Sequence, residues 1–259
     1  MGPKTGLTSA WGSIEDLLAG RCGRAPAAGD VLAFSGTSPV DRFIQKATLS
    51  SISHVAVLIG SPDGGSLSVL EATGAGVTAT PLESSLDAYR RDHTCFFLPL
   101  SETARHSVVP ALLAAYFAEN AGQRYNYAGV AAAGLYEIEN PLFHLLMDHA
   151  GQRFHVPRVA QWWSGLGAKL WDAIFNIDPD YRRLFCSQLV TAALLATRIL
   201  IPGPPVARLV VPVEVCRFGI YGGAYQLNGD ALLADPFRWG AAPLVAGVEL
   251  LAGDDEIRP

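Results

Sequence analysis

Two short apolar runs, joined by a turn sequence, limit the fold of this chain more than any other feature. Residues 54–60 are apolar and include three β-branched side chains, which is typical of a buried strand. Residues 67–72 form a second run of strand length, and the segment between the runs contains Pro62, Asp63 and Gly64, which is typical of a turn. The sequence therefore predicts a β-hairpin, in which the two runs pair antiparallel.

The hairpin carries two polar side chains that its apolar surroundings do not explain. His54 opens the first run and Glu71 lies near the end of the second, so the hairpin would bring them together. A carboxylate beside an imidazole fixes the tautomer and the orientation of the ring, as in a catalytic triad. The alternatives are a polar cap on the sheet for His54, a solvated strand end for Glu71, and Asn126 as the residue that orients the ring.

Cys186 opens a long apolar run of helical character. A thiol at a helix N-terminus feels the partial positive charge of the unpaired backbone N–H groups, which favours the thiolate. With His54 as the base and Glu71 as its orienting partner, Cys186 would be the nucleophile of a Cys-His-Glu triad that forms an acyl-enzyme. The alternative is that Cys186 is a buried core residue with no catalytic role. That interpretation applies to the other cysteines, Cys22, Cys95 and Cys216.

The composition is that of one folded domain. With 259 residues, of which 50% are hydrophobic and 17% charged, the chain can bury one substantial core. The first convincing strand begins at Gly29, so residues 1–28 are expected to be a leader with one short helix, and residues 29–259 the catalytic domain. The further elements expected are a helix at residues 41–47, a strand at 94–100 and a helix at 107–121.

Residues 140–181 differ in character from the rest of the chain and predict an inserted helical lid. The stretch holds three tryptophans and, towards its end, apolar residues at helical spacing. An alternative is an amphipathic surface that makes peripheral contact with a membrane. Its histidines, His144, His149 and His155, are five and six residues apart, a spacing that does not place all three on one helix face as metal ligands.

Charge and cysteine spacing argue against several function classes. The net charge is −5 and the sequence has no basic stripe, so a nucleic-acid partner is not expected. The four cysteines are widely spaced and form no zinc-ligand pattern, so neither a metal nor another cofactor is expected. The start of the sequence lacks a signal-peptide pattern and no run is long enough to span a membrane. These features predict a cytoplasmic protein. They leave open both export by a non-classical route and the oligomeric state.

The motifs together resemble a known family. They are the Gly29-Asp30 strand opener, the Ser-His-Val strand at residues 53–55, the strand residue Glu71 and the Cys-Ser-x-Leu-Val helix start at residues 186–190. In this order they are similar to the permuted papain-like thiol hydrolases, and in particular to the YiiX-type branch of the NlpC superfamily, which is related to the lecithin:retinol acyltransferases. The similarity spans about residues 29–197, and circular permutation in that family places the His strand before the Cys helix.

The resemblance implies an α+β fold, a circularly permuted papain-like arrangement in which the Cys186 helix packs against an antiparallel sheet that carries His54 and Glu71. It also implies acyl transfer to the thiol, since family members act on amide, ester or thioester bonds, including those of peptides and lipids. The expected substrate is therefore a small molecule, peptide or lipid with an acyl group. Tyr125 is a further candidate, either as a residue that lines the substrate cleft beside the Cys186 helix or as a packing residue with an exposed hydroxyl.

The sequence thus predicts a cysteine hydrolase, of the peptidase or amidase kind, or an acyltransferase. Hydrolysis and transfer to another acceptor both stay open. Two other functions fit the same residues: a catalytically silent module that binds a lipid or peptide, and a secreted effector that uses the same thiol chemistry. The intact set of Cys186, His54 and Glu71 favours an enzyme over the silent module.

Overall fold

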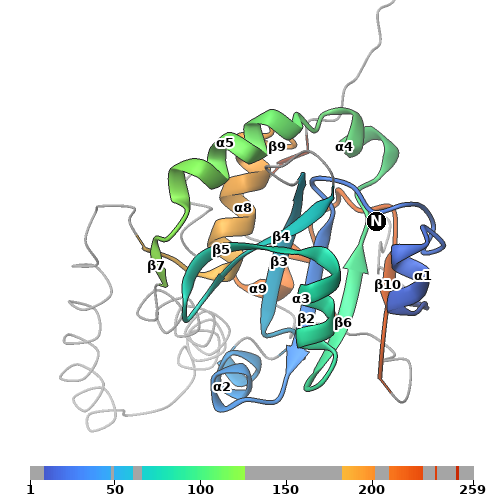
Figure 1. Ribbon diagram of the computed structural model, residues 1–259, viewed down its shortest axis with the longest axis vertical. Helices are drawn as coiled ribbons and strands as arrows, with labels where there is room; N and C mark the ends of the chain where they lie inside the picture. Colours follow the sequence, from blue (N-terminus) through green and yellow to red (C-terminus); the bar gives the residue numbers. More distant parts are fainter. Residues whose placement is uncertain are drawn as a thin grey trace, which may run out of the picture.

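The computed structural model describes residues 9–47, 50–60, 66–125, 183–201, 210–229, 237 and 249–250. A seven-stranded sheet forms the centre of this part of the chain, with the strand order β1-β10-β6-β2-β3-β4-β5 (Figure 1). Its strands are β1 (Ser9–Trp11), β2 (Val31–Gly36), β3 (His54–Gly60), β4 (Leu67–Thr73), β5 (Gly76–Pro81), β6 (His93–Leu98) and β10 (Ala224–Gln226). Neighbouring strands pair antiparallel, except that β1 runs parallel to β10.

Two further pairs of short strands lie outside this sheet. They are β7 (Arg124–Tyr125) with β8 (Arg183–Leu184), which are parallel, and β9 (Leu200–Ile201) with β11 (Glu249–Leu250), which are antiparallel. Strand β8 leads directly into the helix that begins at Cys186, so the parallel pair anchors the start of that helix.

Helices cover both faces of the large sheet (Figure 1). They are α1 (Ile14–Leu18), α2 (Pro39–Ala47), α3 (Leu82–Tyr89), α4 (Glu102–His106), α5 (Pro110–Asn120), α8 (Cys186–Ala196) and α9 (Pro212–Val215). On one face, Val190 and Leu194 of α8 share a buried cluster with Leu113 of α5. On the other face, Leu17 of α1 and Leu86 of α3 are buried in a second cluster. The sheet therefore separates two hydrophobic cores.

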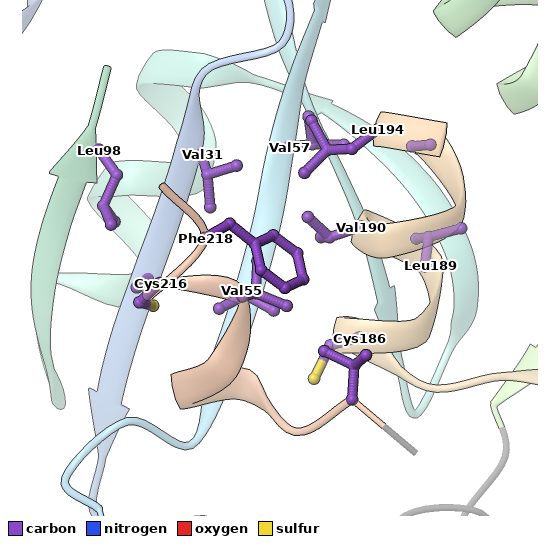
Figure 2. Packing of buried hydrophobic residues seen from close by; sticks show 14 of the residues in the cluster. Val31, Val55, Val57, Leu98, Cys186, Leu189, Val190, Leu194, Cys216 and Phe218 are labelled. Carbon is purple, nitrogen blue, oxygen red and sulfur yellow. The ribbon is translucent and has the colours of Figure 1, made fainter. Parts of the chain in front are cut away.

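Strand β3 contributes to both cores because its side chains alternate between the two faces. Val55 and Val57 belong to the cluster beneath α8, where Figure 2 shows them with Val190. Ala56, between them in sequence, belongs to the cluster on the other face. A strand that is buried on both faces needs apolar side chains in both directions, which is why the run predicted as a buried strand is almost continuously apolar.

The predicted hairpin is confirmed. Strands β3 and β4 pair antiparallel, with Val57 opposite Leu70 and Gly60 opposite Leu67. The mostly antiparallel sheet and its covering helices make the described part of the chain a mixed α and β fold, which is consistent with the predicted α+β class.

One expected helix is confirmed, and three further elements were not expected. The helix expected at residues 107–121 is confirmed as α5, but it begins three residues later, at Pro110, whose missing N–H costs nothing in the first turn of a helix. Helix α4, which precedes it, has no counterpart among the elements expected from the sequence. Strand β5 and helix α3 have no counterpart among the elements expected from the sequence. These two elements matter for the site, because α3 carries Tyr89 to the hairpin.

Residues 9–22 belong to the same unit as the sheet, in contrast to the leader expected over residues 1–28. Strand β1 pairs with β10 at the edge of the sheet. The Ser13 hydroxyl accepts from the Asp16 N–H at 2.9 Å, and the Asp16 carboxylate accepts from the Ser13 N–H at 3.1 Å, which caps α1. Leu17 of this helix is fully buried. The one short helix expected in the leader is therefore α1, and the domain boundary after residue 28 stays a prediction. The packing of this segment against the sheet was not expected, because a strand and a helix this short have little periodicity to reveal it.

Some expectations fall outside the described residues. These are the helical insertion at residues 140–181, with its candidate ligands His144, His149 and His155, and the alternative ring partner Asn126. Within the described ranges, none of the helices is long and apolar enough to cross a membrane.

Candidate active site

Cys186 is the first residue of α8, as its motif predicts. Phe185 before it is extended, with φ −101° and ψ 166°, and its side chain cannot cap the first backbone N–H groups of the helix. The Ser187 hydroxyl donates to the carbonyl of Val210 at 2.6 Å, which ties the start of α8 to the segment before α9. Cys186 therefore lies at the positive end of an 11-residue helix, with 1% of its surface exposed.

His54 and Glu71 make the contact that the hairpin predicts. His54 is the first residue of β3, and its Nε2 lies 2.9 Å from Oε2 of Glu71 on β4. The register, with Val57 opposite Leu70, makes them diagonal neighbours on one face of the hairpin. They are 9% and 6% exposed, so the pair is shielded from water.

Cys186 belongs to the cluster beneath α8, and α8 packs against β3, the strand that His54 opens. Burial alone would lower the pKa of His54, but the charge of the Cys186 thiolate and a hydrogen bond with it, followed by the contacts with Glu71, raise this pKa to about 10. Of the three predicted residues, His54 and Glu71 are therefore in direct contact, and the pairing of His54 with Cys186 stays a prediction.

Tyr89 is a second partner of Glu71. It ends α3, and its hydroxyl donates to Oε2 of Glu71 at 2.5 Å. Burial alone would raise the pKa of Glu71, but the hydrogen bond and charge of His54, together with the Tyr89 hydroxyl, hold it below its usual range. A sequence signal for this residue exists, since Leu82, Leu86 and Tyr89 recur at helical spacing.

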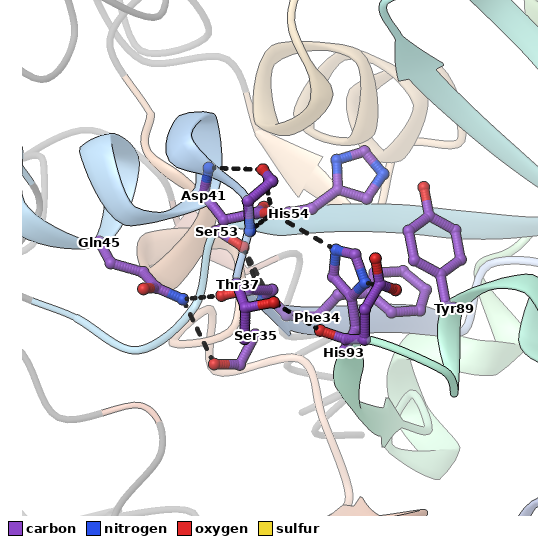
Figure 3. A network of polar contacts seen from close by, with 12 residues as sticks. Phe34, Ser35, Thr37, Asp41, Gln45, Ser53, His54, Tyr89 and His93 are labelled. Atoms are coloured by element: carbon purple, nitrogen blue, oxygen red, sulfur yellow. Dashed lines mark hydrogen bonds and ion pairs between the residues drawn. The ribbon is translucent and has the colours of Figure 1, made fainter.

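A second polar group lies beside Tyr89 (Figure 3). His93 on β6 meets the Tyr89 ring edge-on, with ring centroids 5.0 Å apart. Its Nδ1 lies 2.6 Å from Oδ1 of Asp92, and its Nε2 lies 3.6 Å from Oδ2 of Asp41. Asp41 in turn accepts a hydrogen bond from the Ser38 hydroxyl at 2.5 Å. The His93 ring is therefore held at both nitrogens by carboxylates.

These carboxylates favour the charged form of His93. Burial alone would lower its pKa, but the hydrogen bonds with Asp41 and Asp92 raise it. For Asp41, burial alone would raise the pKa, but the hydrogen bonds from His93 and Ser38 hold it well below its usual range. His93 and Asp41 are thus arranged as an ion pair.

The backbone of Tyr125 lies near the start of α8. Tyr125 is in β7, opposite Leu184 of β8, and Leu184 is two residues before Cys186. This position fits a residue beside the Cys186 helix, and its part in substrate binding stays a prediction.

The remaining groups bear on the chemistry that the site can support. The four cysteines are all buried and none is in a disulfide. Within the part of the chain that the structure describes, no group of three or more His, Cys, Asp or Glu side chains is arranged to hold a metal ion. The backbone N–H of Cys186, at the helix start, is a candidate donor to an oxyanion.

Comparisons with known proteins include a similarity to a solved structure. No protein-family model matches the chain, and no curated protein matches its sequence. The crystal structure of the metalloprotein YiiX from Escherichia coli O157:H7 is similar over 40% of this chain and 54% of that chain, with 24% sequence identity and a TM-score of 0.32. The chain thus matches about half the length of YiiX, at a level that does not establish a family, and membership of the NlpC superfamily stays a prediction.

Proposed function

We propose that the protein is a cysteine hydrolase or acyltransferase that cleaves an amide, ester or thioester bond, with Cys186 as nucleophile, His54 as general base and acid, and Glu71 as the residue that orients His54. One observation carries the proposal. A buried imidazole lies 2.9 Å from a carboxylate and opens the strand against which the helix of Cys186 packs, and both Glu71 and Cys186 favour its charged form. This is the arrangement that thiol-dependent acyl transfer needs.

In the proposed reaction, His54 accepts the thiol proton of Cys186, and the thiolate attacks the acyl carbon of the substrate. A carbon–sulfur bond forms and the carbonyl electrons move to the oxygen, which the backbone N–H of Cys186 stabilises. When the carbonyl re-forms, the bond to the leaving group breaks and His54 gives its proton to that group. The product is a thioester acyl-enzyme.

The second half of the reaction repeats these roles. Water or another nucleophile attacks the thioester, and His54 takes the proton of the attacking group. The carbon–sulfur bond then breaks and the proton returns to the sulfur of Cys186. Attack by water gives hydrolysis, and attack by another acceptor gives transfer. The Cys186 thiol and backbone N–H, His54 and Glu71 have the same roles in both reactions.

The proposal includes a permuted papain-like arrangement. It is supported by the order of the residues along the chain, with His54 and Glu71 on a hairpin and Cys186 on a later helix, and by the packing of that helix against β3 and β4. Peptides and lipids with an acyl group are the proposed substrates.

Trapping of the acyl-enzyme tests this function. The protein is mixed with an acetyl thioester, an activated acetyl ester and an acetyl anilide, and the mass of the peptide that contains Cys186 is followed over time. At least one donor is expected to add one acetyl group to Cys186 and release it again. Cys186→Ala should abolish the adduct, and Cys216→Ala, which removes another buried thiol, should leave it unchanged.

The contrary result is equally specific. A folded protein that binds these donors without forming an adduct or releasing product would be a silent binding module. A secreted effector would form the same adduct, so it differs from a housekeeping enzyme in its target and not in this chemistry.

A further inference from the structure

The Glu71 carboxylate receives two donors on one oxygen. His54 Nε2 lies 2.9 Å from Oε2, and the Tyr89 hydroxyl donates to that same Oε2 at 2.5 Å. A carboxylate held by one partner can rotate about its last bond, whereas two donors from different elements fix its plane. The orientation of Glu71 therefore depends on α3 as well as on the hairpin.

The Tyr89 ring is itself fixed on three sides (Figure 3). It stacks on Phe34 of β2, with centroids 4.1 Å apart and planes 25° apart. It also lies nearly parallel to the His54 ring, at 5.7 Å and 21°. His93 meets it edge-on at 88°. Aromatic contacts of this kind hold a ring in one orientation, so the hydroxyl has a defined direction.

The edge-on partner is fixed in its turn. Carboxylates of Asp41 and Asp92 face the two nitrogens of His93, and Ser38 holds Asp41 at the start of α2. A chain of contacts therefore runs from α2 through β6 and α3 to Glu71.

We propose that Tyr89 is a positioning residue of the candidate active site, which holds the Glu71 carboxylate towards His54, and that His93 and Asp41 fix the Tyr89 ring for this purpose. The inference rests on the proposed function, since it concerns the same Glu71. The competing interpretation is that Tyr89 packs against Phe34 and that its hydroxyl takes the nearest acceptor without any effect on the site.

The Tyr89 hydroxyl is suited to act as a permanent donor. Burial, followed by the charge of Glu71, raises the pKa of Tyr89, so the hydroxyl keeps its proton across the working range. Its hydrogen bond lowers the pKa of Glu71. Removal of the hydroxyl would therefore raise the pKa of Glu71, and the His54–Glu71 pair would be lost at a higher pH.

The test compares Tyr89→Phe with the wild type, because phenylalanine keeps the stacked ring and removes the hydrogen bond. The readout is the rate of iodoacetamide labelling of Cys186 from about pH 4 to about pH 9, which needs no substrate. We expect the acid limb of the profile to move up by about one pH unit, so that labelling on that limb falls about tenfold. Tyr225→Phe is the matched control, since Tyr225 packs against the same buried cluster away from the hairpin.

A double variant separates positioning from packing. In a Glu71→Gln protein no carboxylate remains for the hydroxyl to stabilise, so Tyr89→Phe should add no further change. An unshifted acid limb in Tyr89→Phe, with labelling still dependent on His54, would overturn the role of Tyr89 and leave the proposed function standing. Labelling that is indifferent to His54 in the wild type would overturn both.

Discussion

His54 Nε2 and Glu71 Oε2 lie 2.9 Å apart on the β3–β4 hairpin, and more than nine-tenths of each residue is buried. A buried ion pair is tolerated when its remaining polar atoms have partners, since desolvation otherwise exceeds the attraction. Tyr89 supplies such a partner to Glu71, and in the proposed function Cys186 supplies one to His54. The central claim of the proposed function is that this arrangement activates Cys186.

The titration of His54 is the first prediction. The Cys186 thiolate is the largest cause that raises the pKa of His54, to about 10, so the imidazolium should persist from acid pH through neutrality. In Cys186→Ala this cause is gone and the midpoint should fall towards the ordinary value of about 6.5. NMR of the imidazole nitrogens measures both midpoints, with Cys216→Ala as the control. A wild-type midpoint near the ordinary value, unchanged in Cys186→Ala, would contradict the contact.

The second prediction concerns the charge of Glu71. In Glu71→Gln the amide keeps the size of the side chain but removes the charge that favours the imidazolium. We expect the labelling rate of Cys186 at neutral pH to fall about tenfold, the equivalent of one pKa unit. Glu83→Gln, on the exposed side of α3, should leave the rate unchanged. If Cys186 is labelled at the wild-type rate in both variants, Glu71 neither orients His54 nor favours its charged form.

The third prediction concerns the ion pair between His93 and Asp41. The pKa of Asp41 is lowered in the folded protein, so its contribution to stability is present above its unfolded value of about 3.9 and lost as the pH falls below it. The pKa of His93 is raised, so its contribution is complete below about 6.5 and lost as the pH rises through the folded value. The pair should stabilise the fold most between about pH 4 and 6.5, by about 1 kcal/mol.

Urea unfolding of Asp41→Asn against the wild type at several pH values measures this window. The stability difference should be largest inside it and shrink on either side. Asp87→Asn is the control, because Asp87 pairs with Arg90 at the exposed surface, where such pairs contribute little. An Asp41→Asn difference that is independent of pH would mean that no ion pair forms.

The fourth prediction tests whether residues 9–22 belong to the folded unit. Leu17 is fully buried and its neighbour Leu18 is 42% exposed. Leu17→Ala should lower the free energy of unfolding by about 2–5 kcal/mol, whereas Leu18→Ala should change it by less than about 0.5 kcal/mol. Equal and small effects would favour the expectation that this segment is a leader.

The hairpin and its two polar residues could be predicted because the information is local. Strand-length apolar runs and a turn sequence fix the pairing, and the pairing fixes which side chains meet. The helix start at Cys186 is also local. Tyr89, by contrast, reaches Glu71 because α3 packs against β4, and nothing in the sequence around Tyr89 specifies that acceptor.

The contrast between local sequence signals and tertiary packing also explains the other features that the sequence did not predict. The parallel pairing of β1 with β10 joins segments more than two hundred residues apart, so its energy comes from tertiary contacts. The group around His93 draws its carboxylates from α2 and from the turn before β6. This arrangement follows from the packed structure and not from any motif.

The most direct measurement of the central claim is the iodoacetamide labelling rate of each cysteine, by peptide mass spectrometry, in the wild type and in His54→Ala. All four cysteines are buried, so access alone does not distinguish them, and burial raises the pKa of Cys22, Cys95 and Cys216. These three are therefore internal references for an ordinary buried thiol.

The account predicts that at neutral pH Cys186 is labelled at least about tenfold faster than the three references, the equivalent of one pKa unit. In His54→Ala this advantage should disappear while the reference rates stay the same. A Cys186 that is labelled as slowly as the references, or equally fast with and without His54, would contradict activation by the His54–Glu71 pair.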